Sequence, residues 1–113
     1  MTPSEALAVC RLRQWHSDRT AARSGRTCNY RNTGWIERRQ RQADARIVRM
    51  LDFEKAFASL TDTEQVMLAS AYADGAQAAD TARAAGCCVR KVAYALPAAR
   101  RHLAEALAAL DLL

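Results

Sequence analysis

The chain has 113 residues, a formal net charge of +5, four glycines and two prolines. This length has room for one compact domain, or one domain with an arm, and excludes two full domains. Residues that favour helix interiors dominate, while β-branched and aromatic runs are missing, so the composition predicts an all-α fold.

The positive charge is unevenly distributed along the chain. Residues 1–50 contain eleven arginines and four acidic residues, a net charge of +7, whereas residues 51–113 carry a net charge of −2. Within that acidic half, the stretch from Thr81 to His102 holds five basic residues and no acidic one. Such a concentration of charge suits a polyanionic partner.

The sequence offers no candidate catalytic or membrane segment. No apolar run approaches the roughly 20 residues that span a bilayer, and Arg11 and Arg13 interrupt the only apolar stretch near the N-terminus. There is no phosphate-binding glycine loop and no Ser, His and Asp set in a recognisable context. We therefore expect a cytoplasmic protein with no membrane partner, no enzymatic activity and no cofactor.

The four cysteines do not predict a disulfide or a metal site. In a reducing compartment they are expected to be thiols. The gaps between Cys10, His16 and Cys28 match none of the usual paired zinc spacings, and no Cys-x-x-Cys is present. Cys87 and Cys88 are expected to fill a turn as small apolar residues. We expect no bound metal.

Residues 1–34 are predicted to form an N-terminal helix and a basic arm. Thr2 and Glu5 form a capping box, Pro3 suits the first helical position, and the helix is expected to end near Ala22. Its apolar stripe is Leu7, Ala8, Leu12 and Trp15. Four arginines at the end of the helix and in the arm could contact nucleic acid: Arg19, Arg23, Arg26 and Arg31. Such a segment is more often only a loop.

Residues 35–59 are predicted to form one long amphipathic helix. Apolar residues recur every seven positions at Ile36, Ala43, Met50 and Phe57, with Ile47, Leu51 and Ala58 on the adjoining ridge. Such a stripe usually packs on its own domain. It could also support a homodimer.

Residues 60–113 are predicted to form a helical domain. Thr61 and Glu64 form a second capping box, which starts a helix that ends at Asp74 and Gly75. Further helices are expected from about Gln77 to Ala85, from Cys88 to Leu96 and from Pro97 to Leu110. Pro97 either kinks the helix that begins at Cys88 or opens the last one.

Three residues of this domain meet the demands of a helix-turn-helix. Ala82 is small enough for a helix crossing, Gly86 can adopt a positive φ in the turn, and Val92 is an apolar residue for the inner face of the second helix. Leu96 continues that buried face one turn later. Gln77 and Cys88 stand at the two helix starts without a capping side chain.

The segment from Leu60 to Leu103 resembles, without a gap, the fourth conserved region of bacterial sigma factors and the related domain of small phage late-gene activators. The matching residues are Leu60, Glu64, Leu68, Tyr72, Gly75, Ala82, Gly86, Val92, Leu96, Ala99, Arg100 and Leu103. The resemblance implies a four-helix unit that reads a promoter element and can also touch RNA polymerase. Gln77 and Cys88 depart from the family, which usually has Ser or Thr there, and Pro97 falls where its recognition helix continues.

The resemblance places the second helix of the motif in the major groove of double-stranded DNA. Arg90 and Lys91 are the best candidates for contacts with base edges or nearby phosphates. Arg100 and Arg101 are expected to contact phosphates. The full candidate set is Val89, Arg90, Lys91, Ala93, Tyr94, Arg83, Arg100 and Arg101.

The sequence therefore predicts a DNA-binding transcription regulator of phage or prophage type. One alternative is a protein-interaction factor that binds RNA polymerase or a sigma factor and inhibits or redirects transcription. A weaker alternative is a packaging factor similar to a phage small terminase subunit. The basic residues could also be no more than the solvated face of two helices.

Overall fold

The computed structural model describes the backbone of residues 1–23 and 33–113, and the side chains of residues 1–21, 41–42 and 44–113. These residues form helices and, within the described ranges, no strand, which confirms the all-α prediction. The elements are α1 (Pro3–Arg23), α2 (Thr33–Ala58), α3 (Asp62–Leu68), the π-helical segment η1 (Ala69–Ala73), α4 (Ala78–Ala85) and α5 (Val89–Ala109). None of the described helices is long and apolar enough to cross a membrane.

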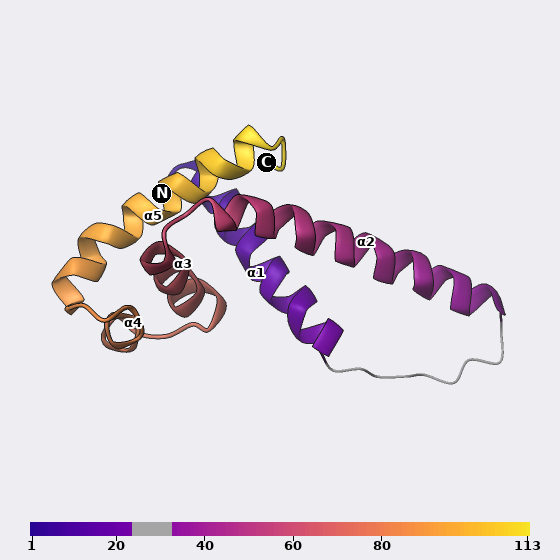
Figure 1. Ribbon diagram of the computed structural model, residues 1–113, viewed down its shortest axis with the longest axis horizontal. Helices are drawn as coiled ribbons and strands as arrows, with labels where there is room; N and C mark the ends of the chain where they lie inside the picture. Colours follow the sequence, from indigo (N-terminus) through magenta and orange to yellow (C-terminus); the bar gives the residue numbers. More distant parts are fainter. Residues whose placement is uncertain (24–32) are drawn as a thin grey trace.

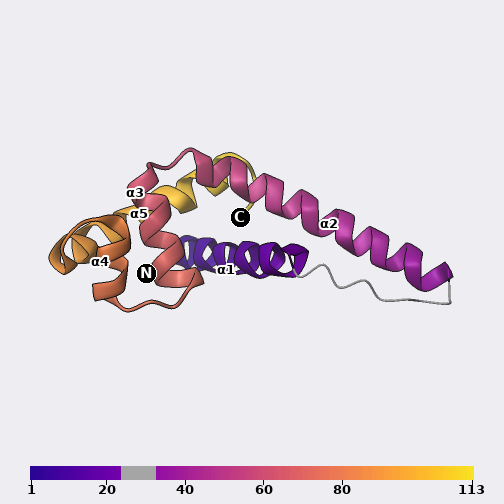
Figure 2. The same ribbon diagram turned by 60° about the horizontal axis from the view of Figure 1, so that its bottom comes forward.

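The helices are arranged along an axis of 55 Å (Figure 1). At one end α1 and α2 run antiparallel, and α2 extends further than α1 in both views (Figures 1 and 2). At the other end lie α3, η1 and α4. Helix α5 joins the two ends, because its first half packs on α3 and α4 and its second half on α1, α2 and α3.

Both capping boxes that the sequence predicts are present. The Thr2 hydroxyl accepts a hydrogen bond from the Glu5 amide at 3.2 Å, and the Glu5 carboxylate accepts one from the Thr2 amide at 2.9 Å. Thr61 and Glu64 make the same pair of contacts at the start of α3. Each box satisfies backbone donors that a helix start leaves free, which fixes where α1 and α3 begin.

The main core lies between α1, α2 and the second half of α5. An aromatic cluster is its centre: the ring centroids of Trp15, Phe53 and Phe57 lie 5.4 Å from one another. Ala8, Leu12 and Trp15 are buried as predicted. Leu7 is 51% exposed, and its place in the predicted stripe is wrong, because α1 turns it about 100° away from Ala8.

Helix α2 buries only part of the face that the sequence predicted. Phe57 is buried and Met50 packs against the core as expected, and the helix adds Phe53 and Ala56. The predicted adjoining ridge is wrong, since Ile47, Leu51 and Ala58 are exposed. The reason is that Trp15 of α1 contacts both phenylalanines and so fixes the rotation of α2. The side chains of Ile36 and Ala43 lie outside the described residues.

A smaller core cluster holds α4 against α3 and the first half of α5. Met67, Ala82 and Val92 are buried there, with Leu96 partly buried beside both this cluster and the main core. The hydroxyls of Ser70 and Thr81, both buried, lie 3.2 Å apart and link η1 to α4. The predicted inward positions of Ala82, Val92 and Leu96 are therefore confirmed.

Helix α5 continues through Pro97 as one helix from Val89 to Ala109. It does not divide at Pro97 into the two helices that the sequence allowed. Proline removes the hydrogen bond to the carbonyl four residues earlier, that of Ala93. Both residues are exposed, so water can solvate the freed carbonyl, while Val92 and Ala99 hold the helix in the core on either side.

Candidate nucleic-acid interface

The connection between α4 and α5 is a tight turn built on Gly86. Its backbone is left-handed, with φ 71° and ψ 34°. The Gly86 amide bonds to the Arg83 carbonyl at 3.2 Å and the Cys87 amide to the Ala82 carbonyl at 2.9 Å, which is the Schellman pattern of a helix end. Glycine suits this position because a Cβ atom is unfavourable at positive φ. The turn therefore ends α4 and redirects the chain into α5.

One face of α5 is fully turned to solvent. Arg90, Tyr94, Pro97 and Arg101 are exposed and follow one another at intervals of four, three and four residues, which places them on a single line along the helix. Tyr94 is 72% exposed. Six of the candidate DNA-contacting residues are exposed on or beside this line. We call them the basic face of α5: Val89, Arg90, Lys91, Ala93, Tyr94 and Arg101.

The cations of the basic face are not neutralised by the described part of the chain. Among the residues with described side chains, no ion pair involves Arg90, Lys91 or Arg101. Arg83 differs, because it lies in α4 and pairs with Asp80 at 3.6 Å, with both side chains largely exposed. Exposed pairs of this kind are weak, so Arg83 can exchange Asp80 for another anion.

Arg100 lies away from the basic face. Its guanidinium donates a hydrogen bond to the Tyr72 hydroxyl and lies 6.0 Å from the centroid of the Tyr72 ring. Its Nε is buried and has no hydrogen-bond partner among the residues that the structure describes. Arg100 thus links α5 to η1, and its geometry is that of a packing residue more than of a phosphate ligand.

His102 is exposed, and its Nδ1 pairs with the Glu64 carboxylate of the α3 capping box. Partial burial raises the pKa of Glu64, but hydrogen bonds with His102 and Thr61 outweigh it, so the pKa lies below its ordinary value. This contact brings an acidic residue close to the basic stretch. The His102–Glu64 contact lies about 18 Å along α5 from Arg90, next to Arg101 in the sequence.

The N-terminal arginines are not gathered at the basic face in the described residues. Arg19 lies in α1 with its guanidinium 5.4 Å from the centroid of the Trp15 ring. Arg23 is the last residue of α1. Arg26 and Arg31, and with them most of the predicted arm, lie outside the described residues.

The two helix starts of the motif have no side-chain cap, in line with the sequence. Gln77 and Cys88 are the N-cap residues of α4 and α5, and neither side chain bonds to the helix. Cys87 is partly buried against the smaller core cluster, as expected of a turn residue, whereas Cys88 is exposed. Among the described residues, no three potential metal ligands come together.

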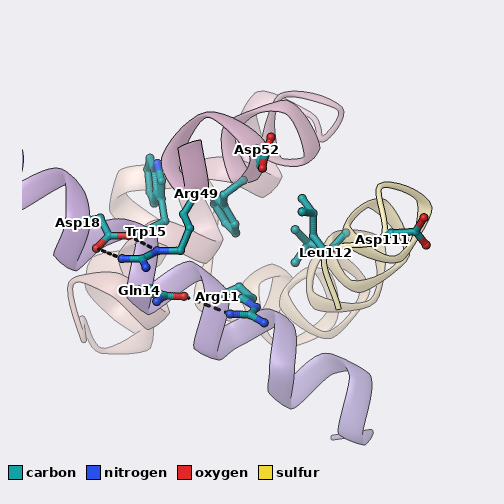
Figure 3. Close-up of a pocket in the computed structure, with 10 residues that line it drawn as sticks. Arg11, Gln14, Trp15, Asp18, Arg49, Asp52, Asp111 and Leu112 are labelled. Carbon is teal, nitrogen blue, oxygen red and sulfur yellow. Dashed lines mark hydrogen bonds and ion pairs between the residues drawn. The ribbon is translucent and has the colours of Figure 1, made fainter. Parts of the chain in front are cut away.

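A pocket of about 310 Å³ lies elsewhere, between α1, α2 and the C-terminal end of the chain (Figure 3). Trp15, Phe53 and Leu112 line it. The arginines at its edge bond to neighbouring side chains, since Arg49 pairs with Asp18 at 3.2 Å and Arg11 bonds to Gln14 at 3.3 Å. These polar groups serve the packing of the helices and point to no particular ligand.

The sequence was compared with models of protein families, with curated proteins and with solved structures, and none of them matched.

Proposed function

We propose that this protein binds double-stranded DNA through the basic face of α5 and acts as a transcription regulator of phage or prophage type. In this proposal α3 to α5 form a unit similar to the fourth region of sigma factors, and α5 is the helix that enters the major groove. The resemblance to sigma factors also implies that the same unit can contact RNA polymerase.

The observation that carries the proposal is the two-sided character of α5. Val92 and Ala99 are buried on one side, while Arg90 and Lys91 are exposed and unpaired among the described residues on the other. From Val89 to Arg101 the helix is about 20 Å long, and a helix with an exposed basic side suits the major groove in both width and charge.

The roles of the individual side chains follow from their chemistry. Arg90 has the planar guanidinium that bonds guanine in a bidentate manner, and Lys91 offers a mobile charge for a base edge or a phosphate. Arg101, eleven residues beyond Arg90 on the same line, is suited to a backbone phosphate. Tyr94 lies between the two arginines and can contact sugar or a thymine methyl group.

Titration of a labelled random duplex, followed by fluorescence anisotropy at several salt concentrations, tests the proposal. We expect wild-type affinity to fall with salt, and we expect Arg101→Ala to reduce the magnitude of the logarithmic salt slope by about 1, because one phosphate contact is lost. Arg11→Ala is the matched control, since it removes one exposed arginine from α1 and leaves α5 intact.

The double variant Arg90→Ala/Lys91→Ala should reduce DNA affinity more than tenfold, while circular dichroism and thermal unfolding remain those of the wild type, because both side chains lie outside the core. Wild-type DNA affinity and salt slope in this variant would refute the proposal.

A specific observation favours the second candidate, a protein-interaction factor that binds RNA polymerase or a sigma factor. Val89 and Tyr94 place exposed apolar and aromatic surface among the cations of the basic face, and aromatic residues are enriched in protein interfaces. Pull-down of purified RNA polymerase separates the two candidates: Tyr94→Ala should abolish capture if this face binds protein, whereas Arg90→Ala/Lys91→Ala should retain it.

A further inference from the structure

Helix α2 is apolar on two opposite faces. Phe53 and Phe57 face Trp15 of α1 and the core. Ile47, Val48 and Leu51 lie outside the core and are 51%, 56% and 53% exposed. An ordinary surface helix has one apolar stripe and a polar opposite face, so a second cluster of large aliphatic side chains indicates an interaction surface.

The second face has the spacing of a helix-pairing seam. Asp44, Val48, Leu51, Lys55 and Ala58 follow one another at alternating intervals of four and three residues, and all of them are exposed. At 100° per residue they lie on the side of α2 opposite Phe53. Paired helices use this alternation at their contact. We call these five residues the outer seam: Asp44, Val48, Leu51, Lys55 and Ala58.

The shape and position of the outer seam leave it open to a partner. A shallow groove is lined by Val48, Leu51, Lys55 and Ala58 of the seam, together with the neighbouring Asp52 and Glu54. In both views α1 runs along one side of α2 (Figures 1 and 2), and because Phe53 and Phe57 face α1, the seam points away from it.

We propose that the outer seam is a self-association surface at which two copies of this chain pair through antiparallel α2 helices. A two-fold axis between Val48 and Leu51 sets each valine against the leucine of the second copy. The same register sets Asp44 opposite Lys55 on both sides of this apolar centre. Parallel pairing would instead oppose Asp44 to Asp44 and Lys55 to Lys55, and like charges in contact are unfavourable.

Asp44 already takes part in an interaction within its own chain. A carboxylate has two oxygens and accepts several hydrogen bonds, so Asp44 can keep that contact and also face a lysine of the second copy.

The length of the seam sets the expected strength of the dimer. Residues 44–58 extend for about 21 Å along a helix, so the seam is short and its contact area falls at the low end of specific interfaces. The dimer is therefore expected to dissociate on dilution. Its formation does not depend on DNA binding, so it is measured on the free protein.

Sedimentation velocity of the full chain over a wide range of concentration tests the proposal. We expect a monomer–dimer equilibrium in the wild type and a monomer for Leu51→Glu at the same concentrations. The matched control is Leu7→Glu, which replaces a leucine of similar exposure in α1 and should leave the dimer intact. A wild-type monomer at every concentration overturns the proposal and leaves the seam to a different protein. A dimer in Leu51→Glu equal to that of the wild type also overturns it.

Charge exchange tests the antiparallel register itself. Asp44→Lys alone should weaken the dimer about tenfold, because it opposes two lysines at both ends of the apolar centre. The double variant Asp44→Lys/Lys55→Glu restores opposite charges only in the antiparallel register and should regain wild-type association. Failure of the double variant to recover would refute the antiparallel register.

Discussion

Substitution of Gly86 tests the turn on which the proposed interface depends. The residue has φ 71°, and a Cβ atom built on it would meet nothing within 4 Å. The cost of Gly86→Ala is therefore the backbone conformation alone, with no added steric clash. An L-residue in the left-handed region costs about 1–2 kcal/mol. Alanine also lowers the conformational entropy of the unfolded chain, which offsets about 0.4–1 kcal/mol of this cost.

These two effects give a net destabilisation of about 1 kcal/mol for Gly86→Ala. In a chain of this size the corresponding fall in Tm is about 4 °C. Asparagine tolerates positive φ better than alanine, and a β-branched residue tolerates it least. The expected order of stability is thus wild type, then Gly86→Asn, then Gly86→Ala, then Gly86→Val.

Chemical denaturation followed by circular dichroism at 222 nm, with thermal melts as a second measurement, gives this order. Gly75→Ala is a matched control: Gly75 has φ 66° and equally open surroundings but lies outside the turn between α4 and α5. It should lose similar stability. A Gly86→Ala variant more stable than the wild type would refute the reasoning, because it is the result expected when a glycine lies inside a continuous helix.

Three further predictions concern contacts within the fold. Ser70→Ala should cost about 1–3 kcal/mol by leaving the buried Thr81 hydroxyl without a partner, whereas Ser70→Ala/Thr81→Val should recover much of that loss in a double-mutant cycle by urea unfolding. The pKa of Glu64 is lowered in the folded protein, so its carboxylate stabilises the fold at pH values above its ordinary pKa of 4.5 and loses this contribution as the pH falls through the folded pKa. Glu64→Gln should therefore be less stable than the wild type at pH 7, and its free energy of unfolding should depend less on pH in the acid range. Leu96→Ala should cost about 2–3 kcal/mol, because Leu96 packs against both core clusters. The smaller cluster, which holds α4, has fewer buried residues to compensate, so hydrogen-exchange protection should fall more in α4 than in α1; equal loss in the two helices would contradict this.

The helix boundaries were well determined by local signals in the sequence. The capping boxes at Thr2 and Thr61 predicted two helix starts, and Gly86 predicted the end of α4. These signals act through backbone hydrogen bonds and φ angles within a few residues, so they do not depend on distant parts of the chain. The exposure of Arg90 and Lys91 followed in the same way from the burial of Val92 on the same helix.

Contacts between distant segments could not be predicted in this way. The sequence contains both Phe53 and Leu51, and either could have faced the core; Trp15 of α1 decides, because its ring packs on Phe53 and leaves Leu51 outside. The hydrogen bond from the Arg100 guanidinium to Tyr72, twenty-eight positions away, was likewise not predicted. Helix periodicity specifies which residues share a face, whereas the partner that covers the face is decided only when the helices pack.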